Sequence, residues 1–176
     1  MKSAIIVLAV LASAAVLYAA EDEAYEKGEA AEAAASAADL APAMKEAKVS
    51  LSDGLKAAEK EGTPISGKFE VEDGKLQLSV YTMKADKFSE VIVDHKTGKV
   101  AKTEPITGGD DLTDAKKQAD AMKKTKRSLR DVVADAEKAN AGYKAVGITP
   151  EIENGAAQAD VSLLKGSEVK KVEEKL

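Results

Sequence analysis

The sequence of 176 residues contains no cysteine, no tryptophan and a single histidine, and aromatic residues make up only 3% of it. Without cysteine the chain can form no disulfide bond and can carry no thioether-linked lipid, which excludes a disulfide-stapled scaffold and a lipoprotein. The scarcity of aromatic rings implies a core of aliphatic side chains. Stability must therefore come from the packing of a modest aliphatic core.

Cations are also in the minority, because 26 Lys and Arg stand against 31 Asp and Glu, a formal net charge of −5. Loss of residues 1–20, which hold one lysine and no acid, would leave a net charge of −6. An acidic chain has no general electrostatic attraction to nucleic acid or to an anionic membrane. We therefore expect no nucleic-acid partner, and no membrane contact after removal of the leader described next.

Residues 1–20 have the layout of a secretory signal peptide: a basic start, an apolar stretch and small residues before an acidic segment. An uncleaved membrane anchor is the alternative, because the apolar residues 3–20 are at the short limit of a span. Cleavage after residue 20 would leave the bulky Tyr18 near the cut, so cleavage after Ala15 or Ala19 stays open. The segment predicts a periplasmic or secreted bacterial protein.

Residues 21–44 are rich in Ala and Glu, which are strong helix formers. Only Leu40 and Met44 in this segment are large apolar residues that could pack against a core. We therefore expect a partly helical tether here.

Three blocks of sequence occur twice in the same order. Residues 50–60 recur as residues 128–138 with six of eleven positions identical. The Glu-Val-Glu-Asp-Gly segment that starts at Glu70 recurs from Glu151, and Ser-Glu-Val recurs near the C-terminus. Matches in this order indicate the duplication of one supersecondary unit.

The first unit predicts a helix followed by antiparallel strands. Ser50 can cap a helix whose apolar face holds Leu51, Leu55 and Ala58. Alternating apolar residues from position 69 onward predict strands, and the Asp-Gly pair that follows is typical of a two-residue hairpin. Further strands are expected over residues 88–93 and 99–102.

The second unit predicts strands over residues 145–152, 157–164 and 168–172, and it lacks the fourth strand of the first unit. One long helix, or two abutting helices, is expected from about residue 111 to residue 140.

The predicted class is α+β: two tandem copies of a helix packed on an antiparallel β-meander, preceded by a signal peptide and an Ala/Glu-rich helical tether. The domain boundaries are 1–20 for the signal peptide, 21–44 for the tether, 45–106 for the first module, and 107–176 for a helical connector plus the second module. A module of about 60 residues is marginal alone, so we expect the two to pack together.

The first unit closes with Val-Asp-His-Lys-Thr-Gly-Lys-Val at residues 93–100. With the helix and hairpin before it, this segment resembles the PepSY domain, whose last hairpin reads roughly Val-Asp-x-x-Thr-Gly-x-Val. The resemblance covers residues 46–103 well and residues 127–176 weakly, through the internal repeat. It implies a non-catalytic module that binds, and can inhibit, peptidases. No peptidase accompanies it in this chain, so any inhibition would act on a separate protein.

The single histidine, His95, lies in this closing turn, where a solvated turn residue is expected. With no second histidine and no cysteine, a transition-metal site would have to use carboxylates alone. We therefore expect His95 to bind no metal.

Acidic residues recur at strand positions, namely Glu70, Glu72 and Asp73 in the first unit and Glu151 and Glu153 in the second. Paired carboxylates can perform acid–base catalysis, but alternation places Glu70 and Glu72 on the solvent face, where nothing would shift their pKa values. The ligand spacing of a calcium loop is also absent. A solvated outer face is the expected role.

Residues 123–127, Lys-Lys-Thr-Lys-Arg, form the one basic run. Four cations in five residues could bind an anionic partner, but a solvated helix face balanced by Asp120 and Asp131 is the favoured interpretation. No aromatic residue is interleaved for base stacking.

Ser79, Ser89 and Ser162 lie in strand patterns with no base motif around them, so no nucleophile is indicated. The Gly-Gly-Asp-Asp segment at residues 108–111 lacks the Lys-Ser/Thr of a phosphate loop. The sequence therefore predicts no catalytic, no cofactor-binding and no metal-binding residues.

Together these features predict a non-enzymatic exported binding module that binds or inhibits a secreted peptidase, or binds an extended peptide segment. An exposed sheet edge or the polar sheet face could take up such a strand by backbone hydrogen bonds. The alternative is a structural or envelope-stress assembly protein of the periplasm. A hydrolytic enzyme is a third class, and it would need a polar site inside a cleft.

Overall fold

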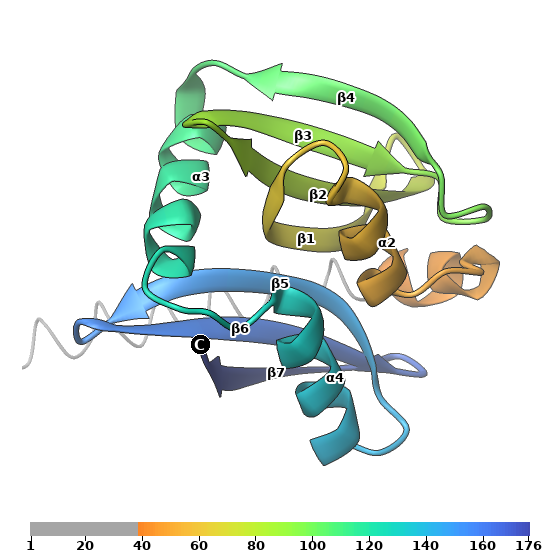
Figure 1. The fold of residues 1–176 in the computed structure, drawn as a ribbon. Helices are drawn as coiled ribbons and strands as arrows, with labels where there is room; N and C mark the ends of the chain where they lie inside the picture. Colours follow the sequence, from red (N-terminus) through yellow and green to blue (C-terminus); the bar gives the residue numbers. More distant parts are fainter. Residues whose placement is uncertain (1–38) are drawn as a thin grey trace, which may run out of the picture. The chain divides into compact units, whose positions relative to one another are not determined.

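A seven-stranded antiparallel sheet organises residues 39–176, the part of the chain that this computed structural model describes (Figure 1). The strand order is β4-β3-β2-β1-β5-β6-β7, which places β1 and β5 inside the sheet and β4 and β7 at its edges. The α+β class is confirmed. The elements in chain order are η1 (Met44–Glu46), α2 (Leu51–Ala58), β1 (Thr63–Glu72), β2 (Lys75–Lys84), β3 (Lys87–Val93), β4 (Val100–Ile106), α3 (Gly109–Met122), α4 (Leu129–Ala139), β5 (Lys144–Glu153), β6 (Ala156–Lys165) and β7 (Glu168–Lys175).

The predicted signal peptide and most of the predicted tether lie outside the described residues. The end of the tether segment is described, and Leu40 is buried in the main core while Met44 packs against it. These are the two residues that the sequence indicated as able to pack.

Local sequence signals explain where α2 begins and which face it buries. The Ser50 hydroxyl accepts a hydrogen bond from the Asp53 amide at 3.1 Å, and the Asp53 carboxylate accepts one from the Ser50 amide at 2.9 Å. This reciprocal capping box satisfies backbone donors that a helix start leaves unpaired. The predicted apolar face of Leu51, Leu55 and Ala58 is buried. Helix α4 begins with a similar Ser-x-x-Asp segment, in which the Ser128 hydroxyl accepts from the Asp131 amide at 3.2 Å.

The turns of the two long hairpins also follow from sequence. Asp73 and Gly74 join β1 to β2, and both have positive φ, 49° and 73°. Asn154 and Gly155 join β5 to β6 with φ of 49° and 83°. Positive φ at both central residues is the requirement of a type I′ turn, which Asn-Gly and Asp-Gly meet at low cost.

Strands β1 and β5 connect the two halves of the sheet. Gly67 pairs with Ile148, and Lys68 pairs with Gly147. Gly67 and Ile148 each precede a repeated acidic segment by three residues. The antiparallel pair is therefore centred on corresponding positions of the two repeated sequence segments.

Each of these central strands also carries an irregularity in its own hairpin. The register of β1 on β2 shifts between Pro64 and Ser66, and that of β5 on β6 shifts between Ala145 and Gly147. Such bulges bend a strand and increase its twist. They occur at corresponding points of β1 and β5.

One aliphatic core spans both halves. It includes Leu55 and Leu78 from the first half, and Val133, Ile148 and Val161 from the second, all at most 1% exposed. Helices α2 and α4 contact each other as well as their own strands. The halves therefore share a single sheet and a single main core, which agrees with the expectation that they pack together.

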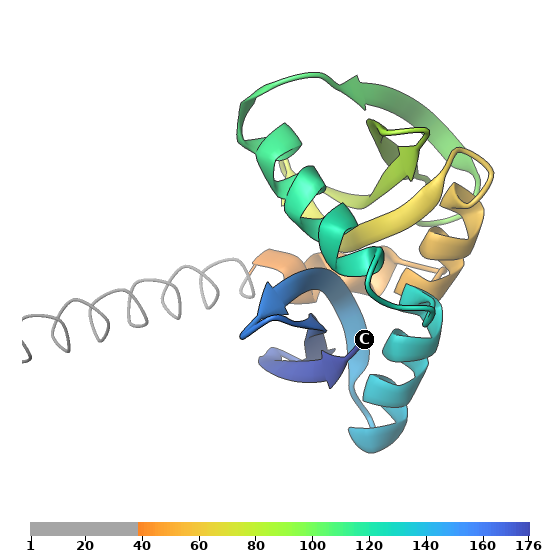
Figure 2. The same ribbon diagram turned by 60° about the vertical axis from the view of Figure 1, so that its left-hand side comes forward.

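Helix α3 covers the opposite face of the sheet from α2. A β-carbon on Gly67 would lie 3.3 Å from Leu55 of α2. The side chain of the preceding residue in β1, Ser66, points to the opposite face of the sheet and donates a hydrogen bond to Gln118 of α3 at 2.7 Å. Figure 2 shows α3 running from the end of β4 to the segment that leads into α4. A second core cluster of Ile65, Phe88, Ala115 and Ala119 lies under α3.

Two alternatives were predicted for the segment from about residue 111 to residue 140: one long helix or two abutting helices. A single helix from about residue 111 to residue 140 is wrong, because α3 ends at Met122 and α4 starts at Leu129. Residues 123–128 form a turn and an extended link instead. The strand expected over residues 99–102 extends to Ile106, and the last strand extends to Lys175.

Candidate functional site

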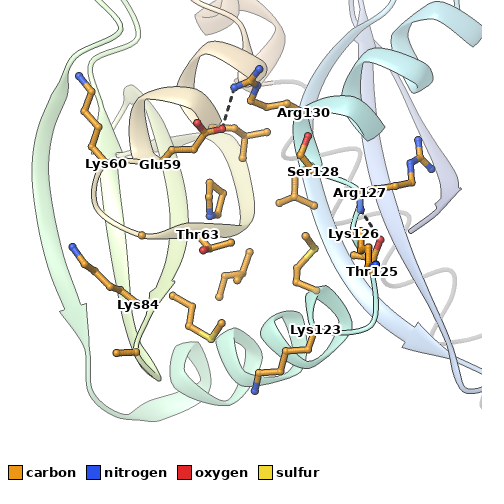
Figure 3. Close-up of a pocket in the computed structure, with 18 residues that line it drawn as sticks. Glu59, Lys60, Thr63, Lys84, Lys123, Thr125, Lys126, Arg127, Ser128 and Arg130 are labelled. Atoms are coloured by element: carbon orange, nitrogen blue, oxygen red, sulfur yellow. Dashed lines mark hydrogen bonds and ion pairs between the residues drawn. The ribbon is translucent and has the colours of Figure 1, made fainter.

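A cavity of about 790 Å³ lies where the end of α2, the start of β1, the end of β2 and the α3–α4 link come together (Figure 3). The end of α2 and the hairpin of β1 and β2 come from the first half, and the link leads into the second. The apolar floor of the cavity is formed by six side chains: Leu55, Pro64, Ile65, Met83, Met122 and Leu129. Burial of apolar ligand surface on such a floor contributes about 25 cal/mol per Å².

The rim of this cavity is strongly cationic. It carries six basic side chains, Lys60, Lys84, Lys123, Lys126, Arg127 and Arg130, and one acidic side chain, Glu59. The chain as a whole has a net charge of −5. Positive charge is therefore concentrated around one apolar hollow of an otherwise acidic protein, which raises the local concentration of anionic ligands.

Three of the six cations are held by partners within the fold. Arg130 forms an ion pair with Glu59 at 3.0 Å, which links α4 to α2. Lys123 pairs with Asp120 at 3.0 Å, and this contact raises the pKa of Lys123. Glu59, Lys123 and Arg130 lie at the border of the cavity (Figure 3).

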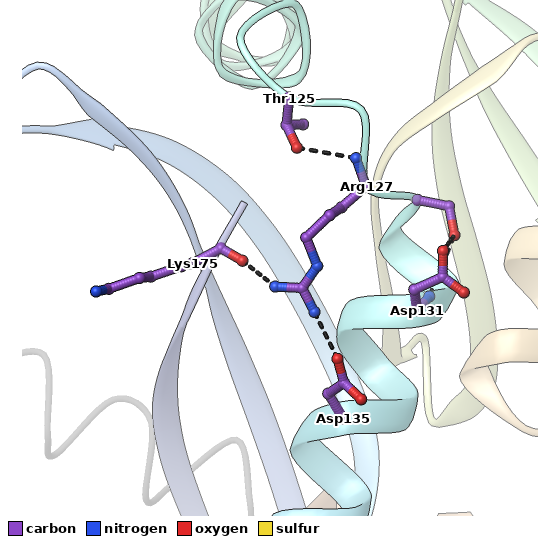
Figure 4. A network of polar contacts seen from close by, with 6 residues as sticks. Thr125, Arg127, Asp131, Asp135 and Lys175 are labelled. Carbon is purple, nitrogen blue, oxygen red and sulfur yellow. Dashed lines mark hydrogen bonds and ion pairs between the residues drawn. The ribbon is translucent and has the colours of Figure 1, made fainter.

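Arg127 is the most tightly held of the cations. Its guanidinium donates to Asp135 of α4 at 2.7 Å and to the backbone carbonyl of Lys175 in β7 (Figure 4). Its backbone amide donates to the Thr125 hydroxyl at 3.0 Å. These contacts join the α3–α4 link to the last strand and fix one wall of the cavity.

The other three rim cations are available to a ligand. Within residues 39–176, the side chains of Lys60, Lys84 and Lys126 take part in no hydrogen bond or ion pair. All three are exposed. They come from the turn after α2, the end of β2 and the α3–α4 link, respectively, so they surround the floor from different sides.

The structure corrects the prediction for the basic run. Residues 123–127 lie in the link after α3, not on a solvated helix face. Asp120 balances Lys123 as expected, and Asp131 lies in the field of Arg127 while it accepts from the Ser128 hydroxyl at 2.7 Å as part of the α4 cap. That hydrogen bond lowers the pKa of Asp131. Sequence reasoning missed Lys60 and Lys84 because they are distant in sequence from the run, and it missed Arg130 because two residues separate it from the run.

Three of the acidic strand residues, Glu70, Glu151 and Glu153, have polar partners within the sheet. Glu70 accepts from the buried Ser79 hydroxyl at 3.0 Å and pairs with Lys68 at 2.7 Å. In the second half, Gln158 donates to Glu151 at 3.2 Å and to Glu153 at 2.6 Å. The corresponding glutamates thus have polar partners on their own sheet face.

His95 differs from the expected solvated turn residue. It is half-buried, and its backbone carbonyl accepts from the amides of Lys48 and Val49 at 2.9 and 3.3 Å. Its Nδ1 atom is buried and has no hydrogen-bond partner among the described residues. Beside it, the backbone amides of Thr97 and Lys96 lower the pKa of Asp94. No group of three or more potential metal ligands occurs among residues 39–176.

The serines and the Gly-Gly-Asp-Asp segment considered in the sequence analysis lie within strands and at the start of a helix. Ser79 is fully buried, and Ser89 and Ser162 lie in β3 and β6. The Gly-Gly-Asp-Asp segment starts α3, where Gly109 adopts a φ of 72°. A smaller polar cavity of about 190 Å³ lies between α3 and the sheet, beside Tyr81.

The sheet edges carry features that discourage strand addition. Edge strand β4 contains Pro105 and a Lys102–Glu104 ion pair of 2.7 Å. Edge strand β7 reads Glu-Val-Lys-Lys-Val-Glu-Glu-Lys. Charged residues and proline are common means of blocking edge pairing.

No family model, curated protein or solved structure matches this chain. Among residues 39–176, no helix combines the length and the apolar character that crossing a membrane requires.

Proposed function

We propose that the chain is a non-catalytic exported binding protein that captures a peptide segment, either free or within a peptidase. The observation that carries this proposal is the cavity with an apolar floor and three unpaired lysines on its rim. An apolar hollow with a few convergent polar groups is the usual form of a binding site. The groups around it are suited to holding a ligand.

Two of the three hydroxyl side chains that line the cavity, those of Ser128 and Thr125, are engaged in hydrogen bonds, which favours binding over hydrolysis. The Ser128 hydroxyl donates a hydrogen bond to the Asp131 carboxylate and accepts one from the Asp131 amide, so it is engaged in capping α4. The Thr125 hydroxyl accepts a hydrogen bond from the Arg127 amide. A nucleophile needs an adjacent base. The histidine of this chain lies in the turn between β3 and β4, which does not line the cavity.

The architecture is best explained by duplication. We infer that each half is a helix packed on an antiparallel meander, the first a PepSY-like module and the second a shortened copy. The repeated sequence blocks, the corresponding bulges of β1 and β5, and the pairing of Gly67 with Ile148 support this inference. The layout of residues 1–20 supports export to the periplasm or beyond.

The direct test is titration of the purified chain against secreted metallopeptidases and against peptide pools, with binding followed by calorimetry and peptidase activity followed in parallel. We expect saturable binding with micromolar or tighter affinity. If neither peptides nor peptidases bind, and light scattering shows a defined oligomer, the assembly role in the periplasm replaces this proposal.

A further inference from the structure

We propose that the cavity recognises an acidic peptide segment in which carboxylates lie on both sides of one large apolar side chain. This inference rests on the proposed binding function and specifies its ligand. The apolar side chain would lie on the floor formed by Leu55, Ile65 and Met83 and their neighbours, and the carboxylates would meet the rim cations.

The three unpaired rim lysines favour a ligand that carries negative charge. Lys60 and Lys84 lie on the first-half side of the floor, and Lys126 lies on the α3–α4 link across from them (Figure 3). The single rim carboxylate, Glu59, is already paired with Arg130. An anionic ligand therefore meets three unpaired cations and no unpaired rim carboxylate, whereas a cationic ligand would be repelled.

The same distribution favours a peptide over a lipid-like anion. A single-headed amphiphile carries charge at one end only, so it could meet the cations on one side of the floor. A peptide carries side chains before and after the apolar residue, so it can meet both sides at once. The volume of about 790 Å³ accommodates one large side chain and the backbone beside it.

The cavity wall is also held in place before any ligand arrives. Arg127 is fixed by Asp135 and by the Lys175 carbonyl, and Arg130 is fixed by Glu59. A pre-organised wall reduces the ordering that binding would otherwise require. Only the three lysine side chains have to become ordered on the ligand.

The absence of tryptophan from the chain gives a direct assay. A Glu-Glu-Trp-Glu-Glu peptide, blocked at both ends, reports its own environment by indole fluorescence and anisotropy when the full chain is added. Lys-Lys-Trp-Lys-Lys and Ser-Ser-Trp-Ser-Ser serve as charge controls, and vesicles of anionic phospholipid serve as the competing ligand class.

We expect the acidic peptide to bind with a blue-shifted indole, and the lysine peptide not to bind. Affinity should fall by about tenfold or more between low salt and 1 M salt, because exposed charges are screened. The variant Lys60→Glu/Lys84→Glu/Lys126→Glu should lose about tenfold or more. The matched variant Lys99→Glu/Lys138→Glu/Lys144→Glu has the same net charge, and its exposed lysines lie outside the cavity, so it should change affinity by less than about twofold.

Circular dichroism establishes that both variants fold, and Lys→Gln replacements at the same three cavity positions provide a milder series. Equal losses in the cavity and control variants, or equal binding of acidic and serine peptides, would overturn the acidic specificity while leaving peptide binding intact. Preferential binding of the vesicles would overturn the choice of a peptide. Failure of all peptides and peptidases to bind would remove the proposed function itself.

Discussion

Gly54 of α2 lies so close to Leu78 of β2 that a β-carbon added to Gly54 would be 2.5 Å from the Leu78 Cδ2 atom. In the second repeat, the residue that corresponds to Gly54 is Val132, and the one that corresponds to Leu78 is Ala159. All four residues are buried. The small and large residues are thus exchanged between the corresponding helix and strand positions, and the combined side-chain volume of Val132 and Ala159 is similar to that of Gly54 and Leu78.

A double-mutant cycle tests this exchange. Gly54→Val alone should lower the free energy of unfolding by about 1–3 kcal/mol, because it overpacks the contact with Leu78. Leu78→Ala alone should cost about 2–5 kcal/mol, because it leaves a cavity. The double variant reproduces the second-half pair, so its cost should be below the sum of the single costs by more than about 0.5 kcal/mol. Urea unfolding measures all three, and strictly additive costs would contradict the volume exchange.

Neither half should fold cooperatively by itself. The main core takes Leu55 from the first half and Ile148 from the second, and β1 pairs with β5. Separate expression of residues 45–106 and 107–176 would expose this shared surface in each piece. Thermal melts by circular dichroism should show no cooperative transition in either fragment. Two independent transitions that match the intact chain would refute the expectation.

Features determined within a few residues were predictable from sequence. The Ser50 cap, the buried face of α2 and the Asp73-Gly74 hairpin turn are confirmed, because each depends on local chemistry. The connector was harder, since apolar spacing continues from α3 into α4. Chain direction changes at residues 123–128, where the helical hydrogen bonds stop.

The cavity depends on contacts that no local pattern records. Lys60, Lys84 and Lys126 are brought together by the turn of β1 back along α2 and by the position of the α3–α4 link. The ion pair of Arg130 with Glu59 joins residues 71 positions apart. The basic run was visible in sequence, but its role depended on the apolar floor beside it, which only the packing of the two halves creates.

The α2 cap should make stability depend on Ser50 in a pH-dependent way. Ser50→Ala should cost about 1 kcal/mol near neutral pH, because it removes the hydroxyl from the cap. The Ser50 hydroxyl is also the main cause that lowers the pKa of Asp53 below its ordinary value of 3.8. A lowered folded pKa gives stability that is present above pH 3.8 and lost as the pH falls through the folded value.

The difference between wild type and Ser50→Ala should therefore shrink in acid. Chemical unfolding at a series of pH values measures it. Ser52→Ala, within the same helix, is the control and should not destabilise the chain, because alanine is the better helix former. A cost of Ser50→Ala that stays constant well below pH 3.8 would show that the Asp53 carboxylate takes no part.

Tyr81 should give the opposite dependence at alkaline pH. Burial raises the pKa of its phenol above the ordinary value of 10.0, and the nearby carboxylates of Glu90 and Glu70 raise it further. The unfolded chain loses the Tyr81 proton at a lower pH than the folded chain does. The contribution of Tyr81 to the free energy of unfolding is therefore complete below pH 10.0 and declines as the pH rises above it. Tyr81→Phe has no such proton, so its stability relative to wild type should rise in that range. The difference in phenolate absorbance between wild type and Tyr81→Phe follows the same group in the folded chain, and an ordinary pKa for it would contradict the packing of Tyr81 under α3.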